Sequence, residues 1–161
     1  MALAEGERLR LEAVLAASEA QLMRLATATQ HKSRWRIAVA AHKRAESLVL
    51  LGRLSEGLAA CREFTERYGA AADAPTQVLV ASALRFQGLA LRGLGQPRAE
   101  LDTCREAVRR FRSAPEPVLR EVTAQSLLVA AQIHDELGEP EQATTALEDL
   151  LRLGAEAPAG V

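Results

Sequence analysis

The side chains best suited to nucleophilic, redox or metal chemistry are two cysteines and three histidines. Cys61 and Cys104 are each followed by Arg-Glu and lie 43 residues apart. They are therefore a redox or metal pair, or they occupy the same place in a repeated unit. His31, His42 and His134 have no metal-ligand spacing, and none is close in sequence to a cysteine. We expect no metal site, no cofactor and no enzymatic activity, with a Cys–His nucleophile as the remote alternative.

The 43-residue spacing of the cysteines recurs elsewhere in the chain, which favours a repeated unit over a redox or metal pair. Leu-Gly dipeptides at 51–52, 94–95 and 137–138 fall in register, and a proline stands two residues after the second and third glycines. A fixed period of this size is the signature of a solenoid whose units stack on one another. Glycine suits the end of one helix and proline the first turn of the next, so each unit is predicted to be a helix pair.

The repeat also decides between the alternatives for the cysteines. Both fall in the same core-facing slot of the second helix of a pair. Stacked helices lie about 8–10 Å apart, whereas a disulfide needs Cα atoms within about 7 Å. We therefore expect two buried, unpaired thiols.

The composition limits the fold and the partners. Hydrophobic residues make up 48% of the chain but aromatic residues only 3%, which suits closely packed helices better than a sheet sandwich. The net charge of −1 gives no basic footprint for nucleic acid. The sequence has no secretory signal and no apolar run of membrane-spanning length. We expect a soluble, cytoplasmic protein without nucleic-acid or membrane partners.

Positions around the glycines carry a family resemblance. A small residue precedes each glycine by seven places, a large residue precedes two of them by four, and a small residue follows two of them by five: Ala45, Gly88, Ala131; Leu48, Leu91; Gly57, Ala143. His134 replaces the large residue in the third unit, and Glu100 replaces the second small residue in the second unit. The chain thereby resembles tetratricopeptide repeats in a long variant with a 43-residue period.

The resemblance implies an all-α helix-pair solenoid with a right-handed superhelix, about seven helices and no sheet. Residues 1–30 are predicted to hold an N-terminal helix that packs on the array. Residues 31–154 are predicted to hold three helix pairs, at 33–69, 75–112 and 116–154, and residues 155–161 a flexible tail.

The resemblance further implies that the first helix of each pair lines a concave binding face. The residues expected there or beside it are His42, Glu46, Arg85, Phe86, Leu89, Arg92, Gln132 and Asp135. Arg85 and Arg92 flank Leu89 on one stripe, which suits an acidic-hydrophobic peptide, because arginine binds carboxylates bidentately. The alternative is that these arginines pair with Glu46 and Asp135 as solvated surface bridges.

The predicted function is that of a non-catalytic scaffold or adaptor that binds a protein or peptide. The alternative is a ligand- or peptide-responsive regulatory domain of a larger signalling or transcription system. Such a domain would change the stacking of its helix pairs when its groove is filled.

The segment HKSRWR, at positions 31–36, holds the only tryptophan among basic residues at the start of a predicted helix. Trp35, Arg34 and Arg36 form either a second partner contact or a packed tryptophan with solvated charges. In the packed alternative, Trp35 lies between the N-terminal helix and the first pair.

The last predicted helix is crowded with leucines: Leu147, Leu150, Leu151 and Leu153. Solenoids normally cover their final apolar face. The pattern therefore predicts either a homodimer formed through this end or a longer array of which the chain is a piece.

Overall fold

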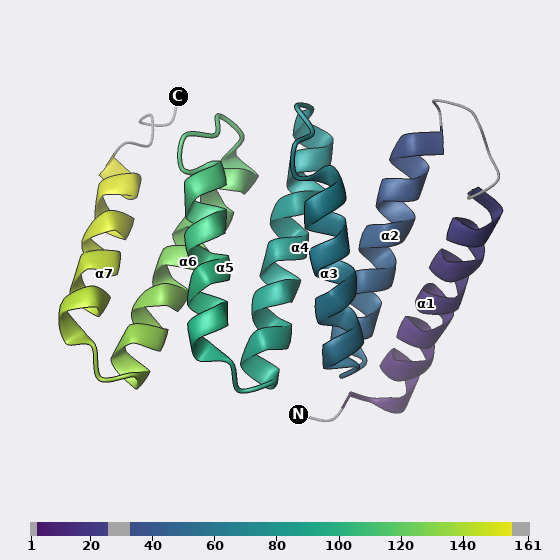
Figure 1. Cartoon of the computed structure of the whole chain (residues 1–161), viewed down its shortest axis with the longest axis horizontal. Helices are drawn as coiled ribbons and strands as arrows, with labels where there is room; N and C mark the ends of the chain where they lie inside the picture. The colour runs from purple at the N-terminus through teal and green to yellow at the C-terminus, as the bar shows by residue number, and fades with distance from the viewer. Residues whose placement is uncertain (1–2, 26–32, 156–161) are drawn as a thin grey trace. The chain divides into compact units, whose positions relative to one another are not determined.

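The computed structural model describes residues 3–25 and 33–155, and every regular element in these ranges is an α-helix. The helices are α1 (Glu5–Leu25), α2 (Ser33–Leu50), α3 (Leu54–Tyr68), α4 (Ala74–Gly93), α5 (Pro97–Phe111), α6 (Pro117–Glu136) and α7 (Pro140–Ala155). The predicted all-α class, with seven helices and no sheet, is thus confirmed for the described ranges (Figure 1).

The chain divides into two compact units, Met1–Gln96 and Pro97–Val161. In the first unit, α2 packs against α1, α3 and α4, and α3 also packs against α4. In the second unit, α6 packs against both α5 and α7. Successive helices run in opposite directions within each unit (Figure 1). The predicted pair at 75–112 is divided by this boundary, because α4 belongs to the first unit and α5 to the second.

Three glycines end the first helix of each predicted pair in the same way. Gly52, Gly95 and Gly138 have φ angles of 77°, 68° and 72°, in the left-handed region that only glycine adopts freely. At the first of them, the Arg53 N–H donates to the Leu48 carbonyl at 2.9 Å, and the Gly52 N–H donates to the Val49 carbonyl at 3.0 Å. Both bonds recur at the other two glycines. This is the Schellman ending, so the 43-residue period repeats a backbone structure.

Residues with known preferences for helix N-termini also stand at the starts of several helices. Pro97 and Pro140 are the first residues of α5 and α7, where the missing N–H costs no hydrogen bond. Asp73 caps α4, because its Oδ1 accepts from the Thr76 N–H at 2.9 Å. Hydrogen bonding to the side chain and backbone of Thr76 lowers the pKa of Asp73.

Both cysteines are buried thiols that form no disulfide, as the repeat predicts. Cys61 in α3 is fully buried and Cys104 in α5 is 7% exposed. Burial raises the pKa of the Cys61 thiol to about 12, so this sulfur stays protonated and unreactive at neutral pH. The two residues are core-forming side chains of their own units.

A close approach of two helices in the first unit lies at Gly57 of α3. A Cβ atom on this residue would stand 2.5 Å from Cγ2 of Val49 and 2.9 Å from its backbone nitrogen. The absence of a side chain therefore lets α3 pack directly on the backbone of α2. The equivalent position in α7 is Ala143, which is buried with its methyl group in place.

Candidate functional site

Three predicted binding residues lie on the exposed side of α4. Arg85, Leu89 and Arg92 are all exposed, and Leu89 keeps 42% of its surface accessible. Their spacing of four and then three residues places them on one stripe of the helix. An exposed leucine between two arginines offers an apolar contact flanked by hydrogen-bond donors.

Phe86 is buried beneath this stripe and contacts Arg85. Its ring is 3% exposed, and the Cζ atom of Arg85 lies 4.7 Å from the ring centroid. This geometry gives a cation–π contact, which restricts the guanidinium without using its N–H donors. Phe86 therefore orients Arg85, and it is too deeply buried to contact a partner directly.

The structure brings His42 of α2 next to these α4 residues. The His42 ring centroid lies 6.3 Å from that of Phe86 and 5.7 Å from that of Phe64 in α3, both edge-on. The sequence pattern predicts that His42 lies on the binding face, but the residue is only 5% exposed. Because α1, α3 and α4 all pack on α2, this position faces the interior.

His42 is chemically unusual for a buried residue, because neither ring nitrogen has a hydrogen-bond partner. Burial lowers its pKa, and the nearby charges of Lys43 and Arg85 lower it further, against an opposing effect of Glu46. The ring is therefore neutral at pH 7. An unsatisfied buried polar group costs about 1–3 kcal/mol, so His42 reduces the stability of this unit.

Glu46 does not pair with Arg85. Its Oε2 lies 2.8 Å from Nζ of Lys43, in a bridge within α2. Among the described residues, Arg85 has no carboxylate partner, and its contact is with the Phe86 ring. The alternative of a surface bridge between Arg85 and Glu46 is therefore wrong, and the Arg85 guanidinium is available to a ligand.

The remaining two predicted residues, Gln132 and Asp135, are exposed on α6 of the second unit. Six of the eight predicted binding residues thus belong to the first unit. Within that unit, His42, Arg85 and Phe86 form one contiguous group.

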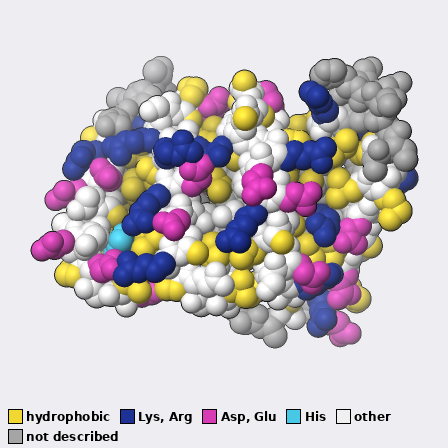
Figure 2. Space-filling view, in the orientation of Figure 1, with side chains coloured by type: hydrophobic (Ala, Val, Ile, Leu, Met, Phe, Trp, Pro, Cys, Tyr) yellow, Lys and Arg dark blue, Asp and Glu magenta, His cyan; other side chains and the backbone are white. Residues whose placement is uncertain are grey.

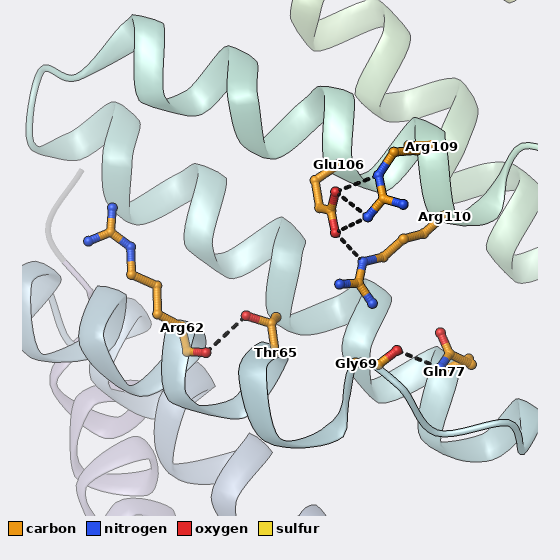
Figure 3. A network of polar contacts seen from close by, with 7 residues as sticks. All are labelled: Arg62, Thr65, Gly69, Gln77, Glu106, Arg109 and Arg110. Carbon is orange, nitrogen blue, oxygen red and sulfur yellow. Dashed lines mark hydrogen bonds and ion pairs between the residues drawn. The ribbon is translucent and has the colours of Figure 1, made fainter.

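Several other arginines differ from Arg85 because carboxylates of their own helix hold them. In α5, Arg109 donates to both oxygens of Glu106 at 2.7–2.9 Å, and Nε of Arg110 also donates to Glu106 (Figure 3). Burial raises the pKa of Glu106, but these hydrogen bonds and charges outweigh it and lower the pKa overall. Figure 2 shows the resulting mixture of acidic and basic side chains on one face of the molecule.

A pocket of about 730 Å³ lies beside Trp35 in the first unit. Its lining residues come from α2, α3, the connection to α4 and the first turn of α4: Arg34, Trp35, Ile37, Ala38, Arg67, Tyr68, Ala71, Asp73 and Thr76. Trp35 is 46% exposed, and no α1 residue lines this pocket. Trp35 is therefore accessible from the pocket and is not fully enclosed between helices.

Of the predicted second contact, Arg34 and Trp35 line the pocket, whereas Arg36 is exposed outside it. His31 lies outside the described residues. Sequence reasoning missed Arg67 and Tyr68 as pocket residues. The sequence did contain an indication of this difference. Tyr68 occupies the same position of the 43-residue repeat as the buried Phe111, but unlike phenylalanine it carries a hydroxyl group.

The second unit has a smaller pocket of about 420 Å³ between α5, α6 and α7. Cys104 and His134 both line it. Nδ1 of His134 lies 2.6 Å from Oε2 of Glu139, and Arg98 donates to the other oxygen of this carboxylate, Oε1. The hydrogen bonds from Arg98 and then His134 lower the pKa of Glu139. This network holds the imidazole against the turn before α7.

The leucines of α7 do not share one environment. Leu147 and Leu151 are 44% and 75% exposed, Leu150 is half-buried, and Leu153 is 4% exposed. The backbone carbonyl of Leu153 accepts from Arg120 of α6 at 3.2 Å. Leu147 and Leu151 therefore form the accessible apolar strip, while Leu153 belongs to the core of its unit.

Within the described ranges, no group of three or more histidine, cysteine or acidic side chains is placed to hold a metal ion. No helix there combines the length and apolarity needed to cross a membrane. Comparison with protein families, with curated proteins and with solved structures finds no match to this chain.

Proposed function

We propose that the chain is a non-catalytic, cytoplasmic scaffold or adaptor of the tetratricopeptide-like kind. It binds an acidic, partly apolar segment of another protein along α4. The observation that carries the proposal is the pair Arg85 and Leu89, which are exposed one helical turn apart while Arg85 has no carboxylate partner among the described residues.

The chemistry of the stripe selects the ligand. Arg85 presents a planar guanidinium that fits a carboxylate with two parallel hydrogen bonds. Leu89 adds apolar area directly beside it, so a ligand with an aspartate or glutamate next to a leucine, isoleucine or phenylalanine satisfies both residues. Phe86 lowers the cost of binding, because it already restricts the Arg85 side chain before the ligand arrives.

The free energies are sufficient for a modest, specific interaction. A solvent-exposed ion pair contributes only about 0–1 kcal/mol. A charge-assisted hydrogen bond that the bound peptide shields from water contributes about 1.5–3 kcal/mol. Loss of the Arg85 contact should therefore weaken binding by about 10–100-fold.

A random peptide library displayed on phage tests the proposal across many candidate ligands at once. Selection on the native chain should enrich peptides with an acidic residue adjacent to a large apolar one. The enriched peptides, synthesised and titrated by calorimetry, should lose at least tenfold in affinity for Arg85→Glu.

Arg62→Glu is the matched control, because Arg62 is an exposed arginine of α3 that does not line the pocket beside Trp35. This variant should bind the enriched peptides within about twofold of the native chain. Enriched peptides without acidic residues, or equal binding by the native chain and Arg85→Glu, would contradict the proposal.

A further inference from the structure

The pocket beside Trp35 is separate from the α4 stripe. It involves Asp73 and Thr76, at the start of α4, whereas Arg85 lies nine residues beyond Thr76. At 1.5 Å per residue, this distance is about 13 Å along the helix axis. The volume of about 730 Å³ falls in the range of about 300–1,000 Å³ that is typical of small-molecule sites.

Two aromatic side chains line the pocket in different ways. Trp35 is 46% exposed and offers much of its indole to a ligand. Tyr68 is fixed, because its ring lies 4.7 Å from that of Phe64 at a tilt of 37°. Burial raises the pKa of Tyr68, against a smaller opposing effect of Arg67, so its phenol is neutral and can donate a hydrogen bond. The lining therefore suits a flat apolar group with a hydrogen-bond acceptor.

The charged residues give the pocket a positive balance. Arg34 and Arg67 have no carboxylate partner among the described residues, and Cζ of Arg67 lies 5.6 Å from the Tyr68 ring centroid. Asp73 is the one acidic residue of the lining, and its Oδ1 is engaged by the Thr76 N–H. Two guanidiniums against one occupied carboxylate favour an anionic ligand.

We propose that this pocket binds a small aromatic acid, with its ring against Trp35 and Tyr68 and its carboxylate on Arg67 and Arg34. Arginine is the residue suited to both tasks, because it binds carboxylates bidentately and stacks on aromatic faces. The pocket is a second site, independent of the peptide-binding stripe.

The single tryptophan makes the pocket directly observable. The chain has one indole N–H, so a ¹H–¹⁵N spectrum contains one indole resonance, and that resonance reports on the pocket. The native chain is titrated with 2-naphthoate, with the neutral 2-naphthalenemethanol and with acetate. We expect 2-naphthoate to shift the indole resonance saturably at a concentration at least tenfold lower than either of the other probes.

Variants assign the carboxylate contact. Arg67→Gln should raise the dissociation constant for 2-naphthoate about tenfold or more, and Arg34→Gln should act in the same direction. Arg62→Gln removes the same charge from α3 outside the pocket and should stay within about twofold of the native chain. Melting temperatures establish that the variants remain folded.

Three results would overturn the proposal. The first is equal affinity for 2-naphthoate and 2-naphthalenemethanol, which would remove the role of the charge. The second is an unchanged dissociation constant in both Arg67→Gln and Arg34→Gln. The third is a 2-naphthoate titration that leaves the indole resonance in place.

Discussion

The pairs α2–α3 and α6–α7 have the same backbone turn but different side chains around it. Gly52 and Gly138 adopt φ angles of 77° and 72° and make the same two hydrogen bonds. The next residue is Arg53 in one pair and Glu139 in the other. Arg53 pairs forward with Glu56, whereas Glu139 pairs back with His134 and also with Arg98. The repeat thus sets the backbone, and each unit completes the turn with its own charges.

The two histidines of the described ranges also differ in the side chains that surround them. His134 stands in register with the fully buried Leu48 and is satisfied by Glu139. His42 stands in register with Leu128, which is 44% exposed, yet His42 is 5% exposed and has no polar partner. A register position therefore fixes where a residue lies on its helix, and the neighbouring helices decide its environment.

The largest expected effect tests the tight contact of the first pair. Gly57→Ala should lower the free energy of unfolding by about 2–3 kcal/mol, because the new methyl group would collide with the Val49 side chain and backbone. The converse change, Ala143→Gly, should cost only about 1 kcal/mol, from the lower helix propensity of glycine. Urea denaturation followed by circular dichroism measures both. A stabilised Gly57→Ala variant would show that α2 and α3 are further apart than described.

The next largest loss of stability is expected from substitutions that test whether the turns at Gly52 and Gly138 are equivalent. Gly52→Ala and Gly138→Ala should each cost about 1–2 kcal/mol, because alanine is strained at positive φ. No atom lies within 4 Å of the added Cβ at either site, so backbone strain is the whole cost. The two variants should therefore agree within about 0.5 kcal/mol in the same urea assay. A large difference between them would break the equivalence of the turns.

Replacing the buried His42 should have a smaller effect, and one that stabilises the fold. His42→Leu should raise the free energy of unfolding by about 1 kcal/mol at pH 7, because it removes a buried group without partners. The pKa of His42 is lowered from 6.5 in the folded chain, so below pH 6.5 the unfolded chain takes up the proton more readily and native stability falls. The advantage of His42→Leu should therefore grow as the pH is lowered from about 7 to about 5.5. A constant difference would contradict the buried, neutral state of His42.

The weakest expected effect concerns the exposed strip of α7. Self-association through this helix is one of the two alternatives that the sequence predicts, and Leu147 and Leu151 are the exposed residues available for it. Light scattering at high concentration should give a mass above that of one chain, and Leu151→Lys should restore the single-chain mass. A native chain that stays monomeric at these concentrations would refute the prediction.

The sequence predicts the parts of this structure that depend on local pattern. Glycine and proline mark the turns because their backbone preferences are intrinsic, and the period places both cysteines inside. The burial of His42 was not predicted, and the sequence left open whether Trp35 is exposed or packed, because both depend on which helices pack beside α2. Arg67 and Tyr68 were missed as pocket residues for the same reason, since the pocket joins segments from three helices.

A charge-swap cycle tests whether Arg85 binds a carboxylate beside an apolar residue. The native chain and Arg85→Glu are each titrated by calorimetry with a selected peptide and with the same peptide carrying lysine in place of its acidic residue. We expect either single change to weaken binding at least tenfold, and the double change to recover most of that loss. Losses that simply add, without recovery, would show that Arg85 does not contact the acidic residue of the peptide.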